Sequence, residues 1–154
     1  MELKPARSRS FRSSTPKRSW RPVGFLTGCR LLAVTHTGPS VLAAHDLSAL
    51  TPTAELVAAE FLANAHLHTA DPYALRLRRS EEGRLRVAVW DSDPRVPPGF
   101  AAGAGSVGGD AESGRGLYLV QACADSWGVS ALREPGAARD GKLLWAECQS
   151  DGLA

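Results

Sequence analysis

Two segments in which apolar and polar residues alternate constrain the fold of this chain more than any other feature. Residues 73–78 and 85–90 each place an apolar side chain at every second position, which is typical of a strand with one buried face. The Glu-Glu-Gly sequence at 81–83 supplies a turn between them. The pattern therefore predicts an antiparallel β-hairpin whose apolar face packs against a hydrophobic core.

Helix and strand signals around the hairpin indicate the fold class. Thr51-Pro52 reads as an N-cap followed by proline at the first helical position, which predicts a helix that begins there. The expected elements are an extended entry and a helix from about Pro39, a helix over 52–68, the hairpin, a helix from Gly114, and strands over 127–132 and 143–148. Helices and antiparallel strands that are segregated along the chain indicate an α+β fold. We expect a two-layer α/β sandwich with a mixed, mostly antiparallel sheet covered on one face by helices.

Charge divides the chain into a basic tail and a mildly acidic body. Residues 1–22 carry seven Lys/Arg and one acid, whereas residues 23–154 carry eleven Lys/Arg and fifteen acids. The tail has almost nothing to bury, so we expect it to be disordered and residues 23–150 to form a single domain. An acidic body argues against a nucleic-acid partner, although a contact through the tail stays open as an alternative.

Targeting and redox signals favour a cytoplasmic protein. No apolar run approaches the roughly 20 residues of a membrane span, and none after the basic start resembles a signal peptide. The three cysteines are far apart and match no metal-ligand spacing, so we expect free thiols in a reducing compartment.

The helix predicted over 52–68 contains an anomaly on its apolar face. At about 100° per residue, a helical wheel places Glu60 and Asn64 between two groups of apolar side chains. These groups are Leu56, Ala63 and Leu67 on one edge of the expected buried arc, and Val57 and Phe61 on the other. A buried carboxylate is costly unless something compensates it. The i, i+4 spacing stacks both side chains on one stripe, as two ligands that share a cation and its water would require. A structural hydrogen bond between the two residues and a helix face that is more exposed to solvent than the wheel indicates are the open alternatives.

Three further features follow this helix. Asp91 lies at a strand end, where a carboxylate can accept the exocyclic amine of a purine, although Asp-Ser-Asp-Pro is also a good turn. Residues 92–111 form a Gly- and Pro-rich segment of a length that is usually functional. Gly114 and Gly116 open a helix, where backbone amides can approach phosphate oxygens.

Four segments together resemble the conserved boxes of a known superfamily. Residues 60–65, 91–94, 113–117 and 141–146 are similar, in order and spacing, to the boxes of the GHKL ATPases, which include gyrase B, MutL and the histidine-kinase catalytic domain. The closest likeness is to the small bacterial anti-sigma factor serine/threonine kinases and related ATP-binding regulatory proteins. The resemblance covers roughly residues 55–147 and implies a Bergerat-type ATP-binding fold.

The resemblance also implies the role of each site residue. Asn64 would hold Mg²⁺, Glu60 would be the general base, and Asp91 would bind the adenine amino group. The remaining expected ATP-binding residues are Gly114, Arg115, Gly116 and Leu117, with residues 95–112 as the ATP lid. The implied reaction is transfer of a phosphoryl group to a serine of an anti-anti-sigma partner. A sigma-factor partner and a homodimer are also implied. A catalytically weak ATP-binding interaction module is the alternative function.

Three departures from the superfamily pattern bear on these expectations. Leu143 replaces the Thr that usually supports the adenine-binding Asp, and Asp93 stands where Gly or Ser is frequent. Both predict weaker nucleotide binding. Gly38-Pro39 interrupts the first helical region, which in the anti-sigma kinases contributes to pairing with a second copy.

Overall fold

The computed structural model describes residues 10–11, 20–27, 40–97, 100, 112–132 and 140–150. Six strands form one sheet in the order β1-β5-β6-β4-β3-β2. The strands are β1 (Ser10–Phe11), β2 (Trp20–Thr27), β3 (Ala74–Ser80), β4 (Leu85–Asp91), β5 (Ser126–Leu132) and β6 (Gly141–Cys148). Only the β1–β5 pair is parallel among these strands, so the expected mixed, mostly antiparallel sheet is confirmed.

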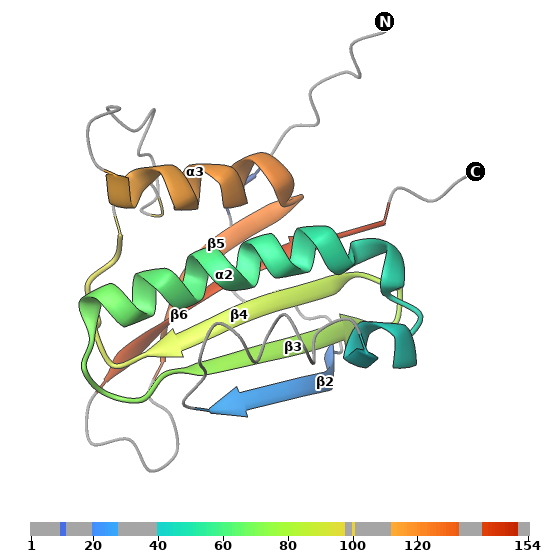
Figure 1. The fold of residues 1–154 in the computed structure, drawn as a ribbon, viewed down its shortest axis with the longest axis horizontal. Coiled ribbons are helices and arrows are strands. Elements are labelled where there is room, and N and C mark those ends of the chain that lie inside the picture. Colours follow the sequence, from blue (N-terminus) through green and yellow to red (C-terminus); the bar gives the residue numbers. More distant parts are fainter. Residues whose placement is uncertain are drawn as a thin grey trace, which may run out of the picture.

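Two long helices of the described residues form the second layer. These are α2 (Thr51–His68), which follows a short 3-10 turn, η1 (Ser48–Leu50), and α3 (Glu112–Cys123). Figure 1 shows α2 and α3 side by side over the same face of the sheet. The two-layer α+β architecture is therefore confirmed. No helix in the described part of the chain is both long enough and apolar enough to cross a membrane.

The core lies between α2 and the central strands. Leu85, Val87 and Val89 occupy alternate positions of β4 and belong to the same buried cluster as Val57 and Phe61 of α2. Burial of such side chains stabilises the fold by about 1.5–3 kcal/mol each. The β3–β4 hairpin has the predicted antiparallel pairing, with Leu77 opposite Val87. Its turn contains Gly83 at a φ of 77°, a left-handed conformation that glycine adopts without strain.

The structure differs from the sequence-based expectations at the end of α2 and at the start of α3. Leu67, placed by the helical wheel on the edge of the buried arc, is 68% exposed because the apolar stripe of α2 is narrower than predicted. Helix α3 begins at Glu112, before the expected start at Gly114. Residues 40–44 are helical, as expected after Pro39, while Gly38-Pro39 lies outside the described residues.

The expected disordered tail over residues 1–22 also differs from the structure. Strand β1 lies within it and pairs with β5, and β2 begins at Trp20 and pairs with β3. Edge strands gain their backbone hydrogen bonds from a neighbouring strand, so they do not require the alternating side-chain pattern that identifies a half-buried strand. The other residues of the expected tail lie outside the described part.

Candidate functional site

The C-terminal ends of α2 and β4 are tied together by a network of short polar side chains. The hydroxyls of Thr69 and Ser92 are hydrogen-bonded at 2.9 Å. Ser92 Oγ also donates to Asp71 Oδ2 at 2.9 Å, and the Asp71 backbone amide donates to Thr69 Oγ1 at 3.1 Å. This network fixes the residue after Asp91 against the residue that ends α2. The last turns of the helix that carries Asn64 therefore lie next to the end of the strand that carries Asp91.

Asn64 occupies a buried position with an unsatisfied oxygen. The residue is only 7% exposed, and Asn64 Oδ1 has no hydrogen-bond partner among the described residues. A buried polar atom without a partner costs about 1–3 kcal/mol. Such an atom points to a ligand that satisfies it, because structural Asn side chains are normally hydrogen-bonded. Glu60, one turn earlier on α2, is half-buried.

Helix α3 approaches α2 closely at Gly116. A Cβ built on Gly116 would overlap the Glu60 carboxylate, so any larger residue there would require the Glu60 side chain to move. Gly114 and Arg115 lie just before it in α3. The Leu117 side chain is buried in the core, so any contact of Leu117 with a ligand would come from its backbone.

The expected lid over residues 95–112 is described only at 95–97, 100 and 112. Phe100 is fully buried and packs edge-on against Phe61 of α2, with ring centroids 5.8 Å apart. Aromatic pairs in this geometry contribute about 0.5–1.5 kcal/mol beyond their burial. This part of the segment is therefore anchored in the core, and the remaining lid residues lie outside the described part.

Asp91 forms a buried ion pair that the sequence did not predict. Lys142 Nζ donates to Asp91 Oδ1 at 2.9 Å, and the two side chains are only 2% and 1% exposed. The Asp93 backbone amide donates to the same Oδ1 at 2.8 Å. Asp91 Oδ2 is buried and has no partner within the described part of the chain. One carboxylate oxygen is therefore held by the protein, and the other is left without a hydrogen bond.

Lys142 is the site residue that sequence reasoning missed. In the β4–β6 register, Asp91 is paired with Lys142 and Trp90 with Leu143. Directly paired residues present their side chains on the same face of a sheet, and successive residues alternate faces. Leu143 therefore lies on the face away from Asp91, and Lys142 supports the Asp91 carboxylate from the strand position directly opposite it. The strand register, which the sequence alone does not give, is the signal that identifies Lys142.

The extra negative charge expected from Asp93 is neutralised locally. Arg95 Nε and NH2 donate to the Asp93 carboxylate at 2.9–3.1 Å. The hydrogen bond from the Arg95 side chain is the main cause that lowers the pKa of Asp93 to about 2. Asp93 therefore contributes an ion pair with Arg95, and not an uncompensated negative charge, near the site. This pairing revises the prediction that Asp93 weakens the binding of a nucleotide.

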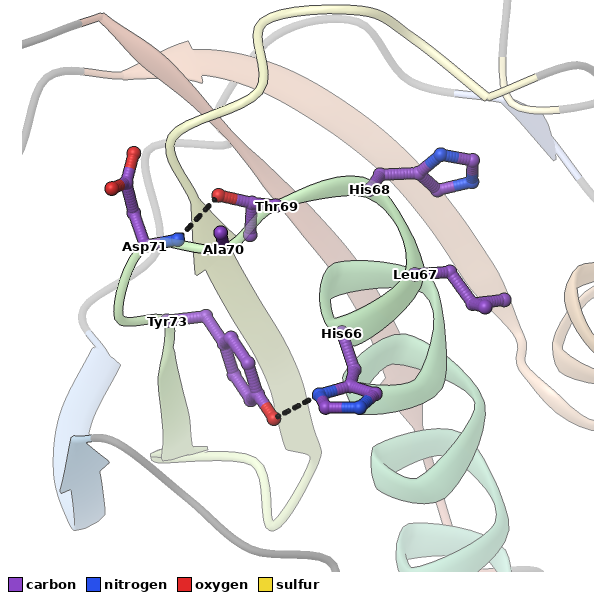
Figure 2. Close-up of a pocket in the computed structure, with 7 residues that line it drawn as sticks. All are labelled: His66, Leu67, His68, Thr69, Ala70, Asp71 and Tyr73. Carbon is purple, nitrogen blue, oxygen red and sulfur yellow. Dashed lines mark hydrogen bonds between the residues drawn. The ribbon is translucent and has the colours of Figure 1, made fainter.

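A surface pocket of about 440 Å³ lies at the C-terminal end of α2 (Figure 2). Its lining residues are His66, Leu67, His68, Thr69, Ala70, Asp71 and Tyr73. Tyr73 Oη lies 3.5 Å from His66 Nδ1, a weak hydrogen bond, while His68 points away from this pair in Figure 2. No group of three His, Cys, Asp or Glu side chains within the described residues is placed to hold a metal ion. Neither Asn64 nor Asp91 lines this pocket, and the pocket provides no further metal-binding side chain next to them.

The two unsatisfied oxygens fit the groups implied by the sequence resemblance. Mg²⁺ prefers oxygen ligands and is usually bound through one or two protein oxygens together with substrate phosphates, which matches a single amide oxygen on Asn64. A purine amine requires an acceptor, which Asp91 Oδ2 provides. The donor set is therefore suitable for ATP with Mg²⁺.

Comparison with known proteins gives a consistent result. The model of a family described as histidine kinase-like ATPase domain matches residues 33–140. An uncharacterized protein of Streptomyces coelicolor is 42% identical over 74 residues, which cover 48% of this chain and 68% of that protein. No solved structure matches. The family match includes Glu60, Asn64 and Asp91 and ends just before β6.

Proposed function

The chain belongs to the histidine kinase-like ATPase domain family, and on this basis we propose that it binds ATP with Mg²⁺ and phosphorylates a serine of a partner protein. The observation that carries the nucleotide site is the pair of buried, unsatisfied oxygens, Asn64 Oδ1 and Asp91 Oδ2, on elements whose ends are joined. Each is an acceptor without a hydrogen bond from any described residue, as a binding site requires.

The proposed roles follow from the chemistry of each group. Asp91 Oδ2 accepts a hydrogen bond from the adenine amine, and Asn64 Oδ1 is a ligand for Mg²⁺. When bound, Mg²⁺ neutralises charge that develops on the phosphate oxygens. The first turn of α3, which contains Gly114 and Arg115, offers backbone amides and the positive end of a helix dipole to the phosphates.

Glu60 is the proposed general base. Its carboxylate takes the proton from the partner serine hydroxyl while the serine oxygen forms a bond to the γ-phosphorus. The bond between the γ-phosphorus and the bridging oxygen breaks, and ADP leaves with that electron pair. Because phosphoryl transfer depends mainly on positioning and charge neutralisation, Glu60 would orient the nucleophile as well as accept the proton.

A second function is favoured by the position of the Glu60 carboxylate. It lies against Gly116 of α3, so the neighbouring helix covers part of the group that would have to receive a serine hydroxyl. A protein in which α3 keeps this position would bind ATP without transferring phosphate. It would then act as an ATP-dependent interaction module.

The Glu60→Gln variant separates the two functions. We expect it to bind Mg-ATP with wild-type affinity and to lose transfer of the γ-phosphate to a co-encoded anti-anti-sigma-like protein, because glutamine keeps the size but not the basicity. The assay is transfer of radiolabelled phosphate, with calorimetry to confirm binding. Equal transfer rates in the two proteins would remove Glu60 from the mechanism. Binding without transfer in the wild type would favour the interaction module.

A further inference from the structure

We propose that Lys142 is a positioning residue for base recognition, which holds Asp91 so that only Oδ2 is presented to the amine of a purine. This inference rests on the proposed ATP site and identifies how that site reads the base. Lys142 lies on β6, beyond the residues that match the family model.

The hydrogen bonds of the Asp91 carboxylate fix its orientation. Oδ1 accepts from Lys142 Nζ at 2.9 Å and from the Asp93 backbone amide at 2.8 Å. Two donors on one oxygen prevent rotation of the carboxylate about its Cβ–Cγ bond. Oδ2, buried and without a partner in the described residues, is then held in one direction.

The support of the Asp91 carboxylate is rigid because two strands and the following segment share it. Lys142 Nζ also donates to the backbone oxygen of Asp93 at 2.8 Å, so it connects the end of β4 with the segment that follows. Asp91 and Lys142 are directly paired across the β4–β6 ladder. A group held by two neighbouring strands is placed more accurately than one held by a loop, and recognition of a base requires that accuracy.

A second buried ion pair among the described residues of the sheet provides a comparison. Arg86 and Glu147 have side chains that are 7% and 5% exposed. Glu147 Oε1 is bonded by Arg86, and Glu147 Oε2 accepts from Ser126 Oγ at 3.2 Å. Both oxygens of Glu147 are thus used within the protein. In the Asp91–Lys142 pair, one buried carboxylate oxygen has no hydrogen bond within the described residues, which indicates a ligand rather than the fold alone.

The test compares ATP with purine riboside 5′-triphosphate, which lacks the exocyclic amine. The full-length protein is titrated with each nucleotide and Mg²⁺ by calorimetry. We expect the wild type to prefer ATP by at least about tenfold, since a hydrogen bond to a charged acceptor is lost with the analogue. In Lys142→Met the preference should fall below about threefold, and Lys142→Arg should restore part of it. A general loss of structure would weaken the binding of both nucleotides equally and leave the ratio of their affinities unchanged.

Matched variants keep the result decisive. Arg86→Met breaks the other buried ion pair and should retain the wild-type preference for ATP even if it is less stable. Should Lys142→Met fail to fold, Lys142→Gln is the deciding variant, and we expect it to lose at least half of the preference. A wild-type ratio in the folded Lys142 variants would overturn the role of Lys142 while leaving ATP binding intact. The role of Lys142 would also be overturned if the wild type bound ATP and the analogue without the amine equally well. A wild type that binds neither nucleotide would instead refute the proposed function.

Discussion

The buried ion pair makes a quantitative prediction about stability. Asp91→Asn leaves the Lys142 ammonium buried with no carboxylate, and Lys142→Met leaves the Asp91 carboxylate buried with no cation. Removal of one partner from a buried pair typically costs about 3–5 kcal/mol. For a chain of this size that corresponds to a decrease in Tm of roughly 10–15 °C.

The double variant Asp91→Asn/Lys142→Met distinguishes the ion pair from general packing. It removes both charges, so no buried charge lacks a partner, and its cost should be smaller than the sum of the two single costs. We expect a coupling free energy of at least about 1.5 kcal/mol. The assay is urea unfolding in nucleotide-free buffer, followed by far-UV circular dichroism, with the m-value compared among all four proteins.

Two results would refute this reasoning. Single variants that each cost less than about 1 kcal/mol would mean that water or side-chain rearrangement solvates the remaining charge. Costs that simply add in the double variant would mean that the two side chains contribute independently. A change in the m-value would signal an altered denatured or native state rather than loss of the pair.

Three further predictions concern the surroundings of the site. Gly116→Ala should lower stability by less than about 1 kcal/mol, because the far end of the Glu60 side chain can rotate away, but it should reduce phosphate transfer in the proposed assay. Asp93→Asn should lower stability slightly at neutral pH, because it removes the exposed ion pair with Arg95, and the difference from the wild type should disappear as pH falls from about 4 to about 2. The pKa of Asp93 is lowered to about 2, so its stabilisation is present above the ordinary pKa and is lost as pH falls through the folded one, which acid titration of both proteins measures. In a Cys29→Ser background, a thiol reagent should modify exposed Cys123 under native conditions and Cys148 only after unfolding, because burial raises the pKa of Cys148 to about 12; rapid modification of both thiols in the folded protein would contradict this.

The parts of the fold that follow local patterns could be predicted from the sequence. The hairpin of β3 and β4 was predictable because alternation over six residues and a Gly-containing turn both act locally. The wheel correctly placed Asn64 in a buried position of α2 but extended the buried face to Leu67, which is exposed. The width of a buried stripe depends on how the helix sits on the sheet, and the helix sequence does not contain that information.

The parts that depend on contacts between distant segments could not be predicted. Strand β1 is identified by its pairing with β5 and carries no apolar alternation of its own. Lys142 acquires its role only through the register of β4 against β6, which sets it beside a residue 51 positions earlier. Because of this buried pair, Asp91→Asn affects folding stability as well as any contact with a base.

The most direct test of the nucleotide site is the affinity for ATP with and without Mg²⁺, measured by calorimetry on the wild type and on Asn64→Ala. We expect the wild type to bind ATP more tightly with Mg²⁺ and the variant to lose this dependence. The variant should keep or slightly increase the stability of the nucleotide-free protein, because it removes a buried oxygen that has no partner among the described residues. Wild-type ATP affinity and Mg²⁺ dependence in Asn64→Ala would contradict the assignment of the site.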